Sequence, residues 1–378
     1  MTNPGGKNNM KKFRIIMLLM ACTLFLAACG KSESSKKGKD NSSNTQLIGQ
    51  TSNKYYQGVI KNGHYQTSKS RGVTVQQNDN QLNLKSFENG LLNISKSHFS
   101  TDKYIFQEGQ YINTNTAEKW LDRKTKKNPE GLNPSGKDTK VPMYLQQIDE
   151  QDFMTQQNNS LKISGMTIGV GINSVYYYRK EAYGAIYQKK LTNSEIKEQG
   201  KQIGNTILQR LRKNKDLKNI PIVIALYKQA PNDSLVGGNF FAYSVNNDGA
   251  TKVSSWQKMN IKNEVLPSQS SKTNNNDEDA FDNFKSQVQN FFPNLSGITA
   301  QAHYVNGKLS GMHVNITTQF YGESEIISFT QYVQTQAEKY LPSGIPIDIS
   351  ISSTEGMQSF LSRSSSSKEF YSHVFSSY

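Results

Sequence analysis

Hydrophobic and polar positions alternate in two distant parts of the chain that resemble each other. A run of β-branched and small residues follows Ser164-Gly165-Met166, and a similar run follows Ser310-Gly311-Met312. Successive side chains of a strand point to opposite faces of a sheet, so this alternation is typical of a strand. The pattern predicts strands over residues 167–172 and 313–317.

A helical pattern follows each of these strands. Thr192 and Glu195 have the spacing of a capping box, and apolar residues then recur at helical spacing up to residue 213. Apolar residues recur in the same way between residues 326 and 340. A second strand follows each helix, over residues 219–224 and 344–349, and both segments contain an Ile-Pro-Ile word.

The repeated order of strand, helix and strand predicts duplication of one unit, although chance similarity of short words is the alternative. We expect an α+β fold of two related strand-helix-strand halves with antiparallel sheet, over about residues 54–265 and 280–378. The first copy is longer, and an insertion over residues 176–190 accounts for the difference. Asn306-Gly307 predicts a tight hairpin turn in the second half.

Other segments give coarser signals. Helical patches occur over residues 84–96 and 116–124, and residues 126–140, with two prolines and two glycines, indicate an exposed loop. The polar residues 266–279 indicate a linker between the halves, and residues 280–292 predict the helix that opens the second half.

The N-terminus has the pattern of a secretory signal. Lys11, Lys12 and Arg14 precede the apolar residues 15–28, which end in small residues before Cys29. Fourteen helical residues at ~1.5 Å each reach about 21 Å, short of the ~30 Å hydrocarbon core, so a permanent membrane span is disfavoured. Met10 offers an alternative start to Met1.

The end of the apolar run, Leu26-Ala27-Ala28-Cys29, resembles a bacterial lipobox. It implies that lipoprotein diacylglyceryl transferase acylates the Cys29 thiol and that signal peptidase II cleaves between Ala28 and Cys29. The alternative is an ordinary signal peptide, residues 1–28, with an incidental cysteine. Residues 29–53, rich in Ser, Lys, Asn and Gly and without aromatic residues, predict a lipidated cysteine and a disordered tether. The body, residues 54–378, would then be held by membrane lipid on the extracytoplasmic face.

Charge and cysteine usage narrow the function classes. The 378 residues carry a formal charge of +14, which by itself suggests an anionic partner. An extracytoplasmic location argues against nucleic acid and leaves anionic lipid, cell-wall polymer or a solvated basic face. The two cysteines, Cys22 and Cys29, both lie at the N-terminus, so disulfides, cysteine zinc sites and a cysteine nucleophile are excluded from the body.

No motif of catalytic, cofactor or metal chemistry stands out, so we predict a protein that is not an enzyme and has no cofactor. His303 and His313 flank the hairpin turn and could form a cross-strand metal pair, or be two ordinary surface histidines. Tyr176 and Tyr178 alternate on a predicted strand beside Arg179 and Lys180. This group is the candidate ligand surface, for glycan or wall polymer, and a half-buried strand is the alternative.

Together these features resemble the CamS family of Gram-positive sex-pheromone lipoprotein precursors. The resemblance rests on the lipobox, the polar tether and segments of the body such as residues 54–60 and 165–170. It implies that the released leader is trimmed to a short hydrophobic peptide that promotes plasmid conjugation in enterococcal recipients. The matching peptide is made of Cys22, Thr23, Leu24, Phe25, Leu26, Ala27 and Ala28. Its residues 23–27 differ from the family's Ile-Phe-Ile-Leu-Ala core.

The resemblance supplies no activity for the body, and three hypotheses stand. The first is a membrane-anchored, non-enzymatic lipoprotein whose leader is the pheromone precursor. The second is a cell-surface binding module for wall polymer or an anionic ligand. The third is an undetected cell-envelope enzyme, which would need a deep pocket gathering His303, His313 and carboxylates.

Overall fold

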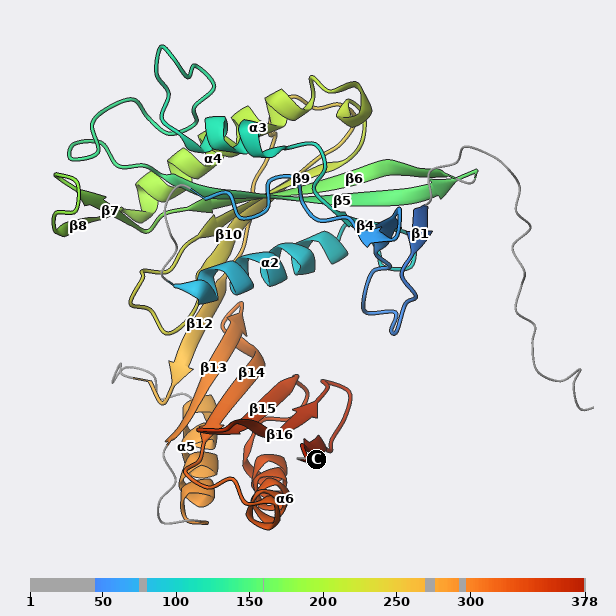
Figure 1. Ribbon diagram of the computed structural model, residues 1–378, viewed down its shortest axis with the longest axis vertical. Coiled ribbons are helices and arrows are strands. Elements are labelled where there is room, and N and C mark those ends of the chain that lie inside the picture. Colours follow the sequence, from blue (N-terminus) through green and yellow to red (C-terminus); the bar gives the residue numbers. More distant parts are fainter. Residues whose placement is uncertain (1–44, 75–79, 159, 269–275, 292–296, 377–378) are drawn as a thin grey trace, which may run out of the picture. The chain divides into compact units, whose positions relative to one another are not determined.

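The structure is a computed structural model that describes residues 45–74, 80–158, 160–268, 276–291 and 297–376 (Figure 1). The predicted leader, Cys29 and residues 30–44 of the predicted tether lie outside the described residues. The tether prediction is wrong at its C-terminal end, because β1 (Thr45–Leu47) pairs with β2 (Val59–Lys61). Backbone hydrogen bonds to β2 hold β1, and all three of its residues are exposed. The strand therefore shows no alternation of buried apolar and exposed polar residues. A short strand, β3 (His64–Tyr65), completes this small sheet.

Two six-stranded sheets form the body, and their strands are arranged in the same way. The first sheet has the order β11-β10-β9-β6-β5-β4. Its strands are β4 (Ile105–Glu108), β5 (Leu145–Gln157), β6 (Ser160–Ile172), β9 (Ile222–Lys228), β10 (Asn239–Asn246) and β11 (Gln257–Lys258). The second sheet has the order β12-β13-β14-β15-β16-β17. Its strands are β12 (Ile261–Leu266), β13 (Gly297–Val305), β14 (Lys308–Thr317), β15 (Ile347–Ser353), β16 (Gly356–Arg363) and β17 (Tyr371–Val374).

The pairing confirms the prediction of two related strand-helix-strand halves. β6 pairs in parallel with β9, and β14 pairs in parallel with β15, because a helix connects the two strands of each pair. The other pairs in both sheets are antiparallel. Each sheet is therefore antiparallel except for one parallel pair. β12 pairs with β13 and so belongs to the second sheet, although the sequence interpretation placed most of it in the first half.

The repeated words mark equivalent positions in the two sheets. Met166 lies opposite Ile222, and Met312 lies opposite Ile347. The backbone N–H of Met166 donates to the carbonyl of Pro221 at 3.1 Å, and that of Met312 donates to the carbonyl of Pro346 at the same distance. This shared register favours duplication over chance similarity of the words.

The helices begin and end close to the predicted limits. They are α2 (Gln81–Lys96), α3 (Thr114–Leu121), α4 (Asn193–Leu211), α5 (Asn276–Gln289) and α6 (Glu323–Tyr340), with a 3₁₀ turn, η1 (Lys215–Leu217). The capping box at α4 is present: the Thr192 hydroxyl accepts from the Glu195 N–H, and the Glu195 carboxylate accepts from the Thr192 N–H. The predicted insertion forms a separate hairpin between β6 and α4, made of β7 (Val175–Arg179) and β8 (Ile186–Lys190).

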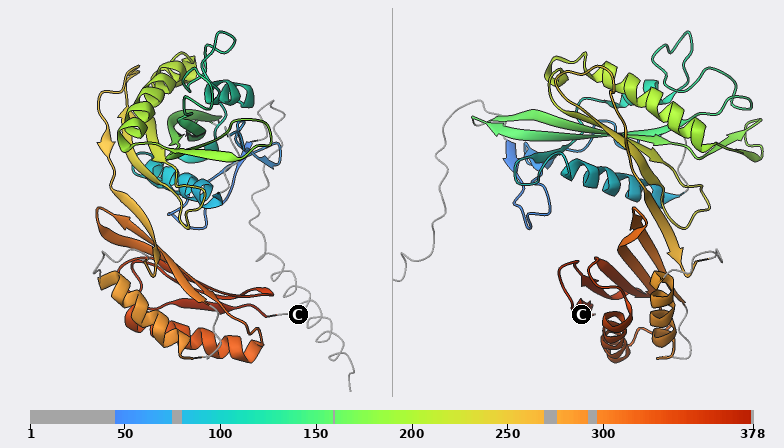
Figure 2. Two further views of the ribbon diagram at one scale, coloured as in Figure 1. Left: turned by 90° about the vertical axis from the view of Figure 1, so that its left-hand side faces the viewer. Right: turned by 180° about the vertical axis from the view of Figure 1, so that it is seen from behind.

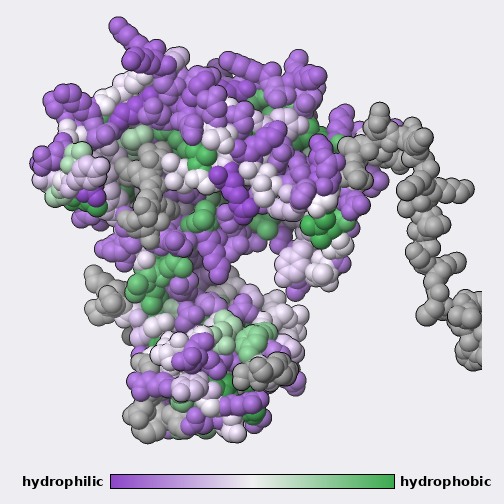
Figure 3. Space-filling model, in the orientation of Figure 1, coloured by the Kyte–Doolittle hydropathy of each residue, from purple (hydrophilic) through white to green (hydrophobic). Residues whose placement is uncertain are grey.

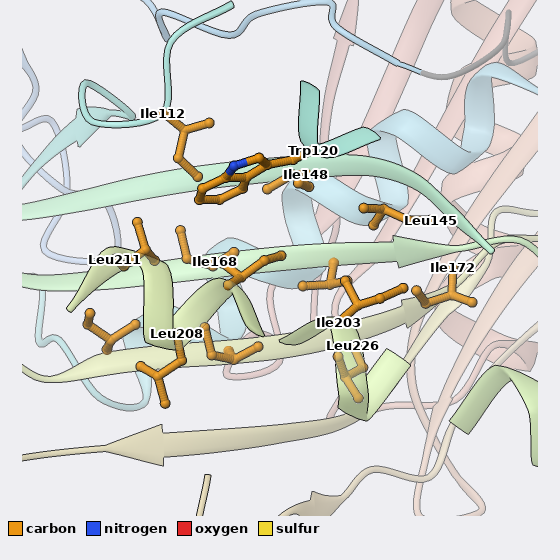
Figure 4. Packing of buried hydrophobic residues seen from close by; sticks show 14 of the residues in the cluster. Ile112, Trp120, Leu145, Ile148, Ile168, Ile172, Ile203, Leu208, Leu211 and Leu226 are labelled. Carbon is orange, nitrogen blue, oxygen red and sulfur yellow. The ribbon is translucent and has the colours of Figure 1, made fainter. Parts of the chain in front are cut away.

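The two sheets differ in how their faces are covered. One face of the first sheet packs against α4, with the α3 residue Trp120 in the same cluster (Figure 4). Its other face packs against α2, where Phe87 and Leu91 contact the buried ring of Tyr227 and its neighbours. The second sheet packs α5 and α6 against one face only (Figure 2). Its opposite face carries no helix among the described residues.

Candidate functional site

The uncovered face of the second sheet carries polar residues. The residues at the equivalent positions of the first sheet are apolar. The shared register makes β15 equivalent to β9 and β14 equivalent to β6. On the covered face the equivalents are apolar in both halves, for example Ile224 and Ile349, which are fully buried. On the other face, Val223, Ala225, Tyr227 and Gly169 of the first sheet correspond to Asp348, Ser350, Ser352 and Asn315 of the second.

Gly169 shows why α2 can cover the first sheet. A Cβ atom at Gly169 would lie 2.6 Å from Cζ of Phe87 and 3.0 Å from a methyl group of Leu91, both on α2. The absence of a side chain therefore lets the helix approach the strand. The second sheet has Asn315 at this position, and its side chain is exposed.

This polar face forms the floor of a groove of about 550 Å³. The opposite wall is the outer side of α2, from which Lys85, Asn89 and Asn93 face the groove one turn apart. The floor and the adjoining β10 and β12 edges contribute Asn239, Asn263, Gln301, His303, His313, Asn315 and Asp348. Figure 3 shows the surface hollowed at this level.

Hydrogen bonds fix the end of the groove where β12 meets the loop before β10. The Asn263 amide donates to the carbonyl of Gly238 at 3.2 Å and to the Asn239 side chain at 3.0 Å. The Gln301 amide donates to the carbonyl of Leu235 at 3.3 Å. Nδ1 of His303 lies 2.6 Å from Oδ1 of Asn263. Partial desolvation in the groove lowers the pKa of His303.

The hairpin places His303 and His313 on the neighbouring strands β13 and β14. His303 is opposite Gly311, two residues from His313 along β14, and both line the groove. The described part of the chain contains no cluster of three or more His, Cys, Asp or Glu side chains that could hold a metal ion. The carboxylate in the groove, Asp348, accepts from the Ser362 hydroxyl at 2.6 Å.

The predicted ligand surface on β7 is partly buried. Tyr176 is only 2% exposed, and its hydroxyl lies 3.3 Å from the Arg123 guanidinium, so its ring cannot meet a ligand. Tyr178 stacks between the rings of Tyr176 and Tyr187, at centroid distances of 5.6 and 5.7 Å.

The two cations beside this ladder are exposed but already engaged. Lys180 lies over the ring of Tyr187 at 4.1 Å, and Arg179 donates to the carbonyl of Gly184. The stacked tyrosines and these cations therefore stabilise the β7–β8 hairpin, which agrees with the half-buried strand weighed as the alternative.

A second cavity, of about 280 Å³, lies between α2 and β5 and gathers carboxylates. Glu88, Glu108 and Asp149 line it, beside Arg71. Burial, with the nearby charge of Glu88, raises the pKa of Asp149 to about 7. This cavity therefore holds a group that titrates near neutral pH.

Two further carboxylates are buried under the loop before α3. The Glu150 carboxylate accepts from the N–H groups of Gln110, Tyr111 and Ile112 at 2.6 to 3.0 Å. Asp152 accepts from the Gln110 N–H at 3.1 Å, and burial beside Glu150 raises its pKa. Both hold this loop against β5.

Sequence reasoning found the histidines of the groove but missed its amides. Asn89 and Asn93 lie on α2, far from β13 and β14 in the sequence, so only the fold brings them together with Gln301 and Asn315. One signal was present: Gln301, His313 and Asn315 occupy the polar positions of alternating strands. Their polarity indicated an uncovered face but not what faced it.

Comparison with known proteins decides the family. The family model described as the CamS sex pheromone cAM373 precursor matches residues 65–369. The chain belongs to this family. No curated protein matches it significantly.

Two solved structures of pheromone precursors are similar to the chain. A sex pheromone precursor from Lactobacillus salivarius subsp. salivarius UCC118 is 52% identical with a TM-score of 0.84; the match covers 88% of this chain and 100% of that one. The C-terminal domain of the staph-cAM373 precursor from Staphylococcus aureus is 35% identical with a TM-score of 0.69, and the match covers 79% and 98% of the two chains. The L. salivarius chain was crystallised, and it corresponds to this chain over its whole length.

The described residues contain no helix long and apolar enough to cross a membrane.

Proposed function

We propose that the chain is a membrane-anchored lipoprotein whose leader is the precursor of a short hydrophobic sex-pheromone peptide that promotes plasmid conjugation. The observation that carries the proposal is the family match, combined with the Leu26-Ala27-Ala28-Cys29 motif at the end of an apolar run. Lipoprotein diacylglyceryl transferase would acylate Cys29, and signal peptidase II would release residues 1–28. Two acyl chains are sufficient for stable anchoring on the extracytoplasmic face.

The organisation of the body supports this proposal. The described unit begins at Thr45, and its first strand pairs with β2. Cleavage before Cys29 would therefore leave every described residue in the mature protein. The leader and the body can then have separate fates: one is trimmed and secreted, and the other stays at the membrane in a non-enzymatic role.

Mass spectrometry of culture medium tests the first fate. We expect a peptide that ends at Ala28 and begins at or near Cys22, and we expect it to vanish when the apolar run is replaced. Mature lipoprotein without any peptide ending at Ala28 would contradict the pheromone role and leave anchoring intact.

A cysteine substitution tests the second fate. Cys29→Ala removes the thiol that accepts the diacylglyceryl group, so the chain should lose metabolic labelling with palmitate and remain uncleaved. Cys22→Ala is the matched control, because this cysteine lies inside the apolar run, and it should keep both labelling and cleavage. Normal processing of Cys29→Ala would contradict the lipoprotein assignment.

A further inference from the structure

The floor of the groove between α2 and the second sheet offers a ligand its side chains and not its backbone groups. This floor is the face of a sheet in which β13, β14, β15 and β16 are each paired on both sides. Their backbone N–H and C=O groups are therefore engaged in the ladders. An extended peptide cannot add to this face as a strand, since that mode of recognition needs a free sheet edge.

The side chains that line the groove are almost all uncharged. Among the described lining residues, Lys85 and Asp348 are the Lys, Arg, Asp or Glu side chains, one of each sign. Phosphate-rich polymers and nucleic acids are bound by clusters of Lys and Arg, and the described lining has no such cluster. The groove therefore favours a neutral ligand, although the chain as a whole is strongly basic.

Carboxamides dominate both walls. Asn89 and Asn93 on α2 and Asn315 on β14 are exposed, and their side chains make no hydrogen bond to any residue that the structure describes. Each carboxamide offers two donor hydrogens and an acceptor oxygen. Such groups pair with hydroxyls, which both donate and accept, and with acetamido groups, which carry one N–H and one C=O.

The floor continues across the sheet to an aromatic edge. Cross-strand register places Asn315 beside Ser350, Ser350 beside Phe360 and Phe360 beside His373, all on the same face. The Phe360 ring lies 6.0 Å from the rings of both Tyr371 and Phe375, which are 65% and 45% exposed. Exposed aromatic rings at the end of a polar face provide flat apolar surfaces for the C–H faces of sugar rings.

We infer that this groove binds a neutral, N-acetylated glycan chain, with its sugar hydroxyls and acetamido groups on the carboxamides of α2 and β14 and one end on the rings around Phe360. The glycan site is thus on the second sheet and α2, and not on the tyrosine ladder of β7 and β8. A body tethered outside the membrane would meet such chains in the cell wall.

The test is a titration of the body, residues 45–378, with the hexasaccharide of β-1,4-linked N-acetylglucosamine, followed by calorimetry and by amide NMR shifts. We expect saturable binding, with shifts at α2, β13 and β14. The double variant Asn89→Ala/Asn93→Ala and the single variant Asn315→Ala should each weaken binding by about fivefold or more, since each loses hydrogen bonds to the ligand. All three residues are exposed, so these variants should fold.

The matched control is Gln331→Ala, which removes an exposed carboxamide from α6, on the covered side of the second sheet. It should leave the affinity unchanged, and an excess of polyglycerol phosphate should not compete. No saturable binding in the millimolar range would overturn the inference, as would equal weakening by Gln331→Ala. Binding of polyglycerol phosphate alone, or of an unstructured peptide at the same residues, would overturn it in favour of a different ligand.

Discussion

The first and second sheets have the same strand order and the same register, but they use their second face differently. In the first, Gly169 and Tyr227 meet the apolar side of α2, so this face is part of the core. In the second, Asn315 and Ser352 occupy the equivalent positions and no described helix covers them. In each half, the apolar packing comes from the face of the sheet that contacts α4 or that contacts α5 and α6. The opposite face of the sheet can therefore become either a second core or a binding surface.

This contrast predicts that aromatic residues packed on the corresponding faces of the two sheets have unequal effects on stability. Phe87 is fully buried between α2 and the first sheet, so Phe87→Ala should lower the free energy of unfolding by about 3–5 kcal/mol. Phe360→Ala removes a half-buried ring from the second sheet and should cost about 1 kcal/mol. Urea unfolding of the two variants measures the difference, and similar losses would show that the second face is also core.

The buried carboxylates of the first half should make its stability pH-dependent. The folded-state pKa of Asp149 is raised to about 7, against about 3.9 in an unfolded chain. Between these values the folded state binds more protons, so stability should fall as the pH rises from about 4 to 7, by about 4 kcal/mol.

Asp149→Asn should flatten this dependence. Asp348→Asn is the matched control, because Asp348 is an exposed carboxylate on the second sheet, and it should leave the dependence unchanged. Urea unfolding at several pH values decides the matter. A stability that rises over this range and is unaffected by Asp149→Asn would contradict the assignment.

The smallest expected difference in stability concerns α4 and α6, the helices that connect the two parallel strands of each half. Thr192 caps α4 with a side-chain hydrogen bond, whereas the N-cap of α6 is Gly322, which has none. Thr192→Ala should therefore cost about 1 kcal/mol, and Gly322→Ser should change stability by a few tenths of a kcal/mol. Thermal unfolding monitored by circular dichroism compares the two, and an equal response would mean that the cap of α4 is not used.

The sequence allowed the repeated unit to be predicted because its signals are local. Alternation, the capping box and the Asn306-Gly307 turn each depend on a few neighbouring residues, and the positive φ angles of Asn306 and Gly307 agree with that turn. β1 was missed because all three of its residues are exposed, so no alternation of apolar and polar residues marks the strand in the sequence. The groove was missed because α2 meets β13 and β14 only through the tertiary fold.

The ligand-surface hypothesis was misplaced for a related reason. Tyr176 and Tyr178 alternate as residues of an exposed strand would, but Tyr176 is buried and interacts with Arg123, which lies more than fifty residues earlier in the sequence. Alternation indicates that two rings share a face. It does not indicate whether another part of the chain covers that face.

A matched exchange at equivalent positions tests the central contrast most directly. Gly169→Asn places a side chain against Phe87 and Leu91, and Asn315→Gly removes one from the uncovered face. We predict that urea unfolding will show a loss of about 3 kcal/mol or more for Gly169→Asn and of at most about 1 kcal/mol for Asn315→Gly. Equal losses, or a larger loss for Asn315→Gly, would contradict the account of one closed and one open face.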